Sequence, residues 1–215
     1  MSELTLIIGN KRYSSWSMRP WLAMKTLGVP FTEQLSPLDL ATNSVHFWEF
    51  SPTKKVPVLV DGDTTIWDSL AILEYVAERF SDLPWWPSDR VTRGVARSVA
   101  QEMHSGFPAL RDECPMNMQR APAAIAVSDA CRVDIDRIET MMQRCYDGHD
   151  GDFLFDQFCI ADAMLAPVAN RVRVYELSEH PAVMKFCDSV EALPAWRQWA
   201  HEAAEEPWVC DAVEI

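Results

Sequence analysis

The sequence predicts a small α/β domain followed by an all-α domain, and three observations lead to that fold class. Strand-like and helix-like segments alternate through residues 1–80. After residues 81–88, a stretch with two prolines, only helical patterns remain. The charge also changes, with twelve basic and twenty-two acidic residues after position 82 against seven and ten in residues 1–82. We therefore expect domains at residues 1–82 and 88–215, joined by a linker at 83–87.

The first domain is expected to follow the order βαβ(α)ββα, a small sheet with helices on both faces. Apolar runs predict its strands, the turn Asp61-Gly62-Asp63 predicts a hairpin, and apolar residues at helical spacing predict its last helix. The expected elements are strands at 4–8 and 31–35, helices at 16–27 and 70–80, hairpin strands at 57–60 and 64–67, and an ambiguous segment at 44–50.

The second domain is expected to contain helices only. Its apolar residues recur at helical spacing, and prolines stand at the start of several segments. The expected helices span 91–110, 122–146, 158–174, 181–193 and 194–204.

Composition limits the function. The chain has 215 residues, 48% of them hydrophobic, and a formal net charge of −13. That charge argues against a broad nucleic-acid surface and against docking on anionic lipid. The sequence contains no stretch long enough to span a membrane and no basic-then-apolar leader, so we expect a cytoplasmic protein.

The six cysteines all lie in the second half of the chain. They form no C-x-x-C pair and have no histidine at zinc-ligand spacing, so free thiols and no metal site are expected. Residues 147–152 are rich in aspartate, but they lack the glycine position and closing glutamate of a calcium loop. A polar connection between helices is the expected structure there.

The segment Tyr13-Ser14-Ser15-Trp16-Ser17-Met18-Arg19 lies where the first strand turns into the first helix. A helix amino terminus offers unpaired N–H groups and the positive end of the helix dipole, which together can hold an anion such as a thiolate. A serine at this position more often caps the helix. The segment alone favours capping over a catalytic role.

Two other points of the first half carry similar alternatives. Proline at the start of a strand, in Lys55-Val56-Pro57, suits either an ordinary trans edge strand or a cis bond that leaves Val56 free to pair with a peptide ligand. Asp68-Ser69 directly precedes the helix at 70–80. Ser69 is expected to cap that helix, although a ligand carboxylate and ammonium would also suit this pair.

Together these motifs resemble the amino-terminal half of the cytosolic glutathione transferases, a thioredoxin-like domain that an all-helical domain follows in that family. The likeness extends over essentially the whole chain. The segment from Tyr13 to Arg19 is most similar to the Ser-Ser-Cys-x-x-Arg signature of the zeta class, with Trp16 in place of the cysteine. The chain is thus identified as a zeta-like, serine-type bacterial member, a class that includes maleylacetoacetate isomerases.

The resemblance implies a role for each matching residue. Ser14, with Ser15 beside it, would activate the thiol of glutathione, the implied co-substrate. Residues Lys55, Val56, Pro57, Asp68 and Ser69 would bind the glutathione backbone and termini. The family places its electrophile pocket between the domains, where Trp16, Met103, Phe107 and Arg111 are candidates. In Phe158–Asp162, which resembles the family's helix-capping segment, Cys159 replaces the usual hydroxyl residue.

The expected activity is conjugation of glutathione to a small apolar electrophile, in a homodimer that serves detoxification. A free thiol has a pKa of roughly 8.5, so a hydrogen bond from Ser14 and the helix terminus would have to favour the thiolate. Two alternatives remain: a glutathione-dependent cis–trans isomerase of the maleylacetoacetate type, and a non-catalytic binding or regulatory protein. A thiol–disulfide oxidoreductase is disfavoured, because the first domain has no cysteine.

Overall fold

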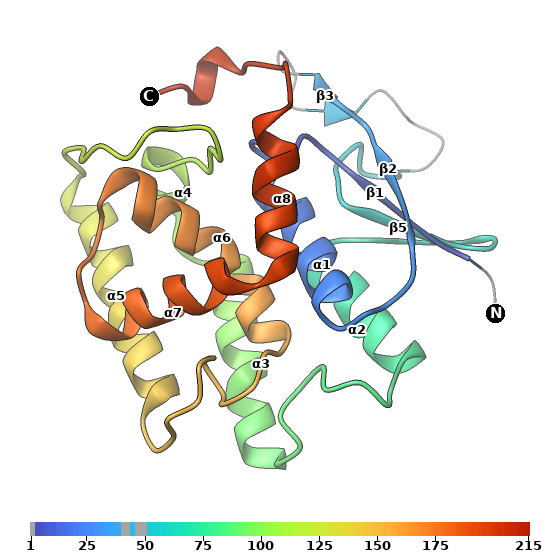
Figure 1. Ribbon diagram of the computed structural model, residues 1–215, viewed down its shortest axis with the longest axis horizontal. Helices are drawn as coiled ribbons and strands as arrows, with labels where there is room; N and C mark the ends of the chain where they lie inside the picture. The colour runs from blue at the N-terminus through green and yellow to red at the C-terminus, as the bar shows by residue number, and fades with distance from the viewer. Residues whose placement is uncertain (1–2, 40–43, 46–50) are drawn as a thin grey trace.

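Figure 1 shows the computed structural model, which describes residues 3–39, 44–45 and 51–215. A mixed sheet lies on one side of the molecule, and a group of helices fills the other side. The observed α/β half followed by an all-helical half confirms the predicted fold class.

The main sheet has four strands in the order β2-β1-β5-β6. Strand β1 is parallel to β2 and antiparallel to β5, and β5 and β6 form the predicted hairpin. Central position explains the apolar sequence of β1, whose Leu6 is fully buried opposite Leu59. The strands are β1 (Leu4–Ile8), β2 (Thr32–Leu35), β5 (Val58–Asp61) and β6 (Thr64–Trp67).

Helices α1 (Ser15–Thr26) and α2 (Ser69–Arg79) pack against each other; α1 also contacts β1, and α2 contacts the hairpin. The helix expected on the other face of the sheet falls on the ambiguous segment at 44–50. There β4 (Ser44–Val45) pairs antiparallel with β3 (Leu38–Asp39), and residues 46–50 lie outside the described part of the chain.

The second half is helical throughout its regular elements. Helix α6 is almost entirely buried and packs against α1, α3 and α7, so it forms the centre of this half. The helices are α3 (Arg90–Ser105), α4 (Pro108–Glu113), α5 (Asp129–Tyr146), α6 (Ile160–Tyr175), α7 (Pro181–Ala192) and α8 (Pro194–Ala204), followed by a short 3₁₀ turn (Asp211–Val213).

The prediction of one helix over 91–110 was wrong, because the structure has two. Helix α3 ends at Ser105; the next residue, Gly106, has an extended backbone, and Phe107 adopts the left-handed conformation with φ 61°. Pro108 then opens α4, where its missing N–H costs no hydrogen bond. The chain therefore turns at Gly106–Phe107 and redirects α4 toward α5, which it contacts.

The prediction of a helix from residue 122 was also wrong. Helix α5 begins at Asp129, and the Ser128 hydroxyl caps it by accepting from the Cys131 N–H at 3.1 Å. Residues 121–128 have no regular structure, and Ala123 donates its N–H to the carbonyl of Val174 at 3.1 Å. The cap of α5 thus lies well after Pro122.

The two halves share a buried junction. Helix α1 contacts both α6 and α8, and the rings of Trp21 and Trp199 meet edge to face with centroids 5.1 Å apart. Lys11 lies over both rings and pairs with Glu33 at 2.6 Å and with Glu202.

All six cysteines fall within the described residues, and none of them forms a disulfide. Among the described residues, no helix is both long and apolar enough to cross a membrane.

Candidate functional site

Ser14 occupies the turn between β1 and α1 and caps the helix. Its hydroxyl oxygen accepts from the Ser17 N–H at 3.4 Å, and its hydroxyl donates to the Ser17 oxygen at 2.8 Å. The Ser17 oxygen also accepts from the N–H of Gly9, at 3.1 Å. The capping interpretation therefore holds for Ser14. To donate to a thiolate, its hydroxyl has to rotate away from Ser17.

Two neighbouring side chains bear on the choice of thiol donor. Ser15, the first residue of α1, is only 7% exposed, and its hydroxyl has no hydrogen bond to any described residue. Tyr13 donates its hydroxyl to Glu214 at 2.5 Å, and burial followed by that bond raises the pKa of Tyr13 to about 12. A thiol activator needs the opposite shift, so Tyr13 is unsuited to that role.

A groove of about 320 Å³ brings together six of the residues singled out from the sequence. They come from three separate segments: the start of α1, the approach to β5 and the start of α2. Ser14 and Ser15 are not among the lining residues; they adjoin the groove through their neighbour Trp16. The lining residues are Trp16, Thr53, Lys55, Val56, Pro57, Trp67, Asp68 and Ser69.

The Val56–Pro57 peptide bond is cis, which decides between the two alternatives left by the sequence. Strand β5 begins directly after it, at Val58. The preceding turn is held by Ser51, whose hydroxyl donates to the Lys55 carbonyl at 2.7 Å and accepts from the Lys55 N–H at 3.0 Å. Val56 thus stands at the rim of the groove, next to a fixed turn.

Asp68, not Ser69, caps helix α2, so the expected cap was wrong by one residue. Asp68 has φ 78°, and its Oδ1 accepts from the N–H groups of Leu70 and Ala71 at 2.9 and 3.1 Å. The Ser69 hydroxyl is buried at 1% residue exposure and has no partner among the described residues. A buried hydroxyl without a partner at a helix amino terminus indicates a missing acceptor, such as a carboxylate.

His104, which sequence reasoning missed, contacts the other oxygen of Asp68. Its Nε2 lies 2.6 Å from Asp68 Oδ2, and its ring meets Trp16 edge to face with centroids 5.3 Å apart. His104 belongs to α3, so this contact joins the two halves of the chain beside the groove. The only sequence signal was its place on the first helix after the linker, between residues that the family resemblance selected.

Two cationic side chains lie close to the Trp16 ring. The guanidinium carbons of Arg19 and Arg111 are 4.2 and 5.0 Å from its ring centre. Arg19 is fully buried; its Nε donates to the Met164 carbonyl at 3.1 Å, but its Nη1 and Nη2 have no partner among the described residues. Burial, then the charges of Arg111 and Arg171, lower the pKa of Arg19 well below its usual value. The groove wall at Trp16 therefore faces a zone of poorly compensated positive charge.

The other three electrophile-site candidates do not line the groove. Met103 and Phe107 are 0% and 4% exposed and belong to the hydrophobic core rather than to the groove lining. Arg111 donates to the carbonyls of Gly106, at 3.0 Å, and Met103. Of the three, only Arg111 approaches the groove, through Trp16.

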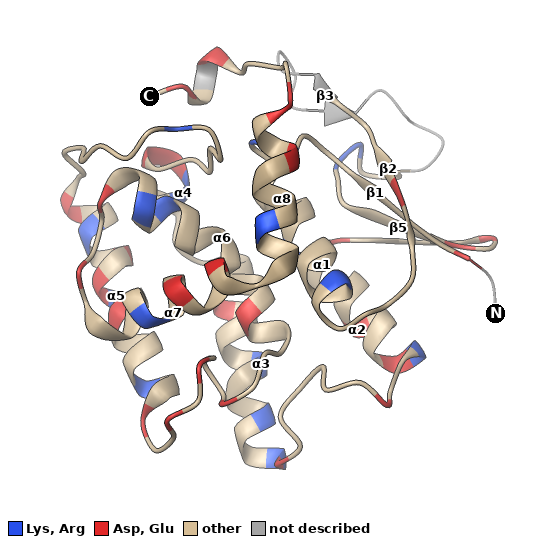
Figure 2. Ribbon diagram, viewed as in Figure 1, with Lys and Arg blue, Asp and Glu red and all other residues tan. Residues whose placement is uncertain are grey.

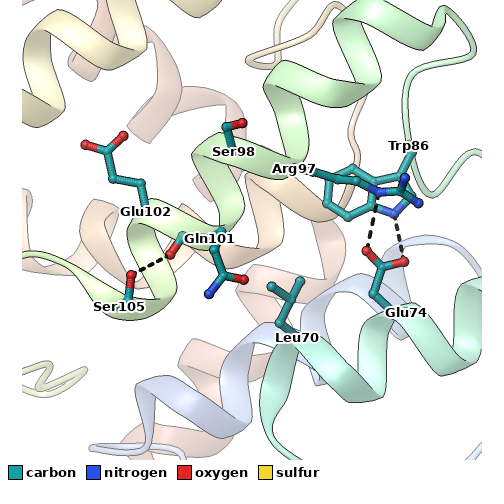
Figure 3. Close-up of a pocket in the computed structure, with 8 residues that line it drawn as sticks. All are labelled: Leu70, Glu74, Trp86, Arg97, Ser98, Gln101, Glu102 and Ser105. Carbon is teal, nitrogen blue, oxygen red and sulfur yellow. Dashed lines mark hydrogen bonds and ion pairs between the residues drawn. The ribbon is translucent and has the colours of Figure 1, made fainter.

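A second, more open groove lies between α2 and α3, with a volume of about 600 Å³ (Figure 3). Glu74 of α2 accepts a hydrogen bond from Trp86 Nε1 at 3.3 Å and pairs with Arg97 of α3 at 3.6 Å, so it links the two sides of this groove. Although this groove is larger, none of the expected site residues lines it, and its two serines, Ser98 and Ser105, donate their hydroxyls to helix carbonyls at 3.1 and 3.0 Å. The smaller groove at Ser69 is therefore the better candidate for a polar ligand.

Within the described part of the chain, no three His, Cys, Asp or Glu side chains gather as a metal site would require.

Comparison with known proteins gives two family matches. The "Glutathione S-transferase, N-terminal domain" matches residues 13–79, and the "Glutathione S-transferase, C-terminal domain" matches residues 95–202. Together they extend over most of the chain, including the groove and all of the expected site residues.

Individual relatives agree with these matches. A probable maleylacetoacetate isomerase of Caenorhabditis elegans is 27% identical, over 85% of this chain and 86% of its own. A stringent starvation protein A homolog of Haemophilus ducreyi is 29% identical, over 80% of this chain and 75% of its own. The solved structure of a Burkholderia glutathione transferase homolog, with bound glutathione, has a TM-score of 0.72 at 23% identity, over 96% of this chain and 100% of its own. With both domain types matched in order, this chain belongs to the glutathione S-transferase family.

Proposed function

We propose that this glutathione transferase binds its co-substrate glutathione in the groove between Val56 and Ser69 and activates the thiol with Ser14. The buried, unpartnered hydroxyl of Ser69 at the start of α2 is the observation that carries the proposal. With the Ser69 N–H beside it, this hydroxyl suits the γ-glutamyl carboxylate of glutathione. The Asp68 carboxylate suits the adjacent ammonium group, and Val56 suits the cysteinyl backbone.

The thiol would then lie toward the amino terminus of α1. A hydrogen bond donated by Ser14, or by the unpaired hydroxyl of Ser15, and the positive end of the α1 dipole would favour the thiolate over the thiol. The cations behind Trp16 act in the same direction. The thiolate would attack an electrophilic carbon of a small second substrate held on the Trp16 side of the groove.

Glutathione titration tests this assignment directly. We expect isothermal titration to give binding in the micromolar to millimolar range, and Ser69→Ala to weaken it by about tenfold, because a charge-assisted hydrogen bond is lost. Ser189→Ala is the matched control: Ser189 lies in α7, where its hydroxyl bonds the Lys185 carbonyl at 2.9 Å. If the wild-type protein binds no glutathione, the groove assignment falls and a non-catalytic role becomes the better interpretation.

The isomerase alternative also has an observation in its favour. Arg19 carries two buried nitrogens without partners among the described residues, and Arg111 lies close to the same Trp16 ring. Uncompensated positive charge of this kind favours an anionic second substrate, and an unsaturated diketo acid is one. The serine pair at 14–15 and the similarity to the worm isomerase support a zeta-like assignment. An assay of maleylacetone isomerisation with and without glutathione decides between isomerase and transferase activity.

We assign the chain to two domains, 1–82 and 88–215, and the family matches on either side of residues 83–87 support that division. A homodimer is supported by exposed apolar residues on α3, where Val91 and Val95 are 71% and 49% exposed. We also propose a detoxification role and a cytoplasmic location; the six described cysteines, which form no disulfide, suit a reducing compartment.

A further inference from the structure

The turn that precedes Ser14 is held by residues far away in the sequence, in the segment 206–215, which we call the strap. Glu206 accepts two backbone hydrogen bonds from this turn, from the Lys11 N–H at 2.6 Å and from the Arg12 N–H at 3.0 Å. Figure 2 shows acidic residues gathered at the end of α8, where the chain passes into the strap. Both oxygens of one carboxylate are thus committed to the backbone that leads into Ser14.

Glu214 makes a second set of contacts to the same turn. Its Oε1 accepts from Arg12 Nη2 at 2.5 Å and from the Tyr13 hydroxyl at 2.5 Å. The Tyr13 oxygen in turn accepts from the Cys210 N–H at 3.1 Å. Asn117 braces this arrangement, because it donates to Glu214 at 3.1 Å and accepts from Arg12 Nε at 3.2 Å.

The carbonyl groups of the turn are fixed by the second half of the chain as well. Trp199 Nε1 donates to the Lys11 carbonyl at 2.9 Å, and the Met118 N–H donates to the Arg12 carbonyl at 3.0 Å. Lys11 and Arg12 are only 4% and 8% exposed. Charge-assisted bonds this well buried from water are stronger than exposed ones, so the turn has little freedom to shift.

We propose that Glu206 and Glu214 are positioning residues for glutathione activation, which hold residues 11–13 so that the Ser14 hydroxyl is presented to the thiol. The inference rests on the proposed role of Ser14. Its physical basis is proximity: Ser14 is the next residue along the chain, and a displacement of about 1 Å in a catalytic group costs a large part of its effect. The strap contacts the turn and, among the described residues, lines no part of the groove, so it acts through Ser14.

The test measures the pKa of the bound glutathione thiol and needs no electrophilic substrate. Calorimetric titration with glutathione in two buffers of different ionisation enthalpy, across a range of pH, gives the protons released and hence the pKa of the bound thiol. We expect Glu214→Ala to raise that pKa by about one unit, which is a tenfold loss of thiolate at a given pH, while glutathione affinity at low pH changes by less than about threefold. Glu214→Gln keeps an acceptor for Tyr13 and should recover most of the effect.

Two further variants separate positioning from folding stability. Glu205→Ala is the matched control, because the Glu205 side chain is 71% exposed and contacts His201 rather than the turn. If Glu214→Ala does not fold, Tyr13→Phe replaces it in the test, since it removes one hydroxyl and its two bonds to the strap. In the double variant, Glu214→Ala should add little to the shift caused by Ser14→Ala, because Glu214 acts through the Ser14 hydroxyl, which is already removed.

The outcomes are distinct. If Ser14→Ala raises the thiol pKa, but Glu214→Ala or its replacement Tyr13→Phe lowers only the melting temperature and leaves that pKa unchanged, the positioning role is overturned. The proposed role of Ser14 is then unaffected. If Ser14→Ala itself leaves the thiol pKa unchanged, the proposed role of Ser14 fails and the inference fails with it. If Ser14→Ala and Glu214→Ala each raise the thiol pKa and their effects do not add in the double variant, both the role of Ser14 and the positioning role of Glu214 are supported.

Discussion

The carboxylate of Asp68 lies 2.6 Å from His104 Nε2, and this contact joins the start of α2 to α3 across the two halves of the chain. The same carboxylate caps α2 through its other oxygen. Asp68 is therefore held at both oxygens before any ligand arrives. An anion fixed in this way is prepared to receive a ligand ammonium without reorganising.

Asp68→Asn should raise KM for glutathione by about tenfold to a hundredfold with little change in kcat, because a hydrogen bond between two charged groups contributes about 1.5–3 kcal/mol. His104→Ala should raise KM by a smaller factor, since it frees the carboxylate without removing it. Steady-state kinetics over a range of glutathione concentrations measure both effects. Asp63→Asn, an exposed aspartate in the β5–β6 turn, is the control. A loss of kcat alone in Asp68→Asn would contradict an ammonium-binding role.

Ser14→Ala should lower kcat/KM by about tenfold to a hundredfold near neutral pH, because one hydrogen bond to the thiolate is worth one to two units of thiol pKa. The loss should disappear at pH values above the ordinary thiol pKa, where glutathione ionises without help. A pH–rate profile of wild type and variant measures this convergence.

Two other variants separate loss of thiol activation at Ser14 from loss of helix capping and from a role of the neighbouring serine. Ser14→Ala also removes a helix cap, and Ser128→Ala removes the cap of α5 far from the groove, so it controls for stability. Ser15→Ala tests the neighbouring hydroxyl. A larger loss in Ser15→Ala than in Ser14→Ala would transfer the thiol-activating role to Ser15.

Val95→Glu should weaken the proposed homodimer by at least about tenfold, because it would place a charge within the apolar patch that we propose as the interface. Val91 and Val95 continue the face of α3 that forms one wall of the groove in Figure 3. Analytical ultracentrifugation over a concentration series measures the dissociation constant. Leu35→Glu places the same charge at a 37% exposed apolar residue of β2 and serves as the control. A wild-type protein that sediments as a monomer would contradict the dimer itself.

Local patterns predicted most of the fold. The strands and helices of the first half follow from runs and periodicities confined to a few residues, such as the Asp61-Gly62-Asp63 turn. Where the structure differs, the cause is also local. Gly106 and Pro108 end one helix and start another, and Ser128 caps α5 beyond Pro122.

The site was less predictable, because its decisive contacts are long-range. The segments that line the groove could be selected from the sequence through turn residues and the family resemblance. The pairing of Asp68 with His104, and of Tyr13 with Glu214, links residues whose proximity depends on how the two halves pack. Periodicity places Met103 and Phe107 on a helix but cannot distinguish a core position from a pocket wall.

Asp162 should make the stability of the fold fall as pH rises from about 4 to 6. It is fully buried at the start of α6, where it accepts from the N–H groups of Leu154 and Cys159 at 2.9 and 2.8 Å. Burial nevertheless raises the pKa of Asp162 to about 6 from 3.8. Between these values the unfolded chain releases the proton and the folded chain keeps it, so stability is lost as pH rises through the folded pKa.

The expected loss is up to about 3 kcal/mol relative to Asp162→Asn, since each unit of pKa corresponds to about 1.4 kcal/mol and asparagine does not titrate. Urea unfolding of both proteins at pH 4, 5, 6 and 7 gives the free energy of unfolding of each. The difference, wild type minus variant, should fall between pH 4 and 6 and level off toward pH 7, and Asp150→Asn, at an exposed position in the preceding connection, is the control. A difference that rises with pH would mean that the two N–H bonds outweigh burial and that the pKa of Asp162 lies below its usual value.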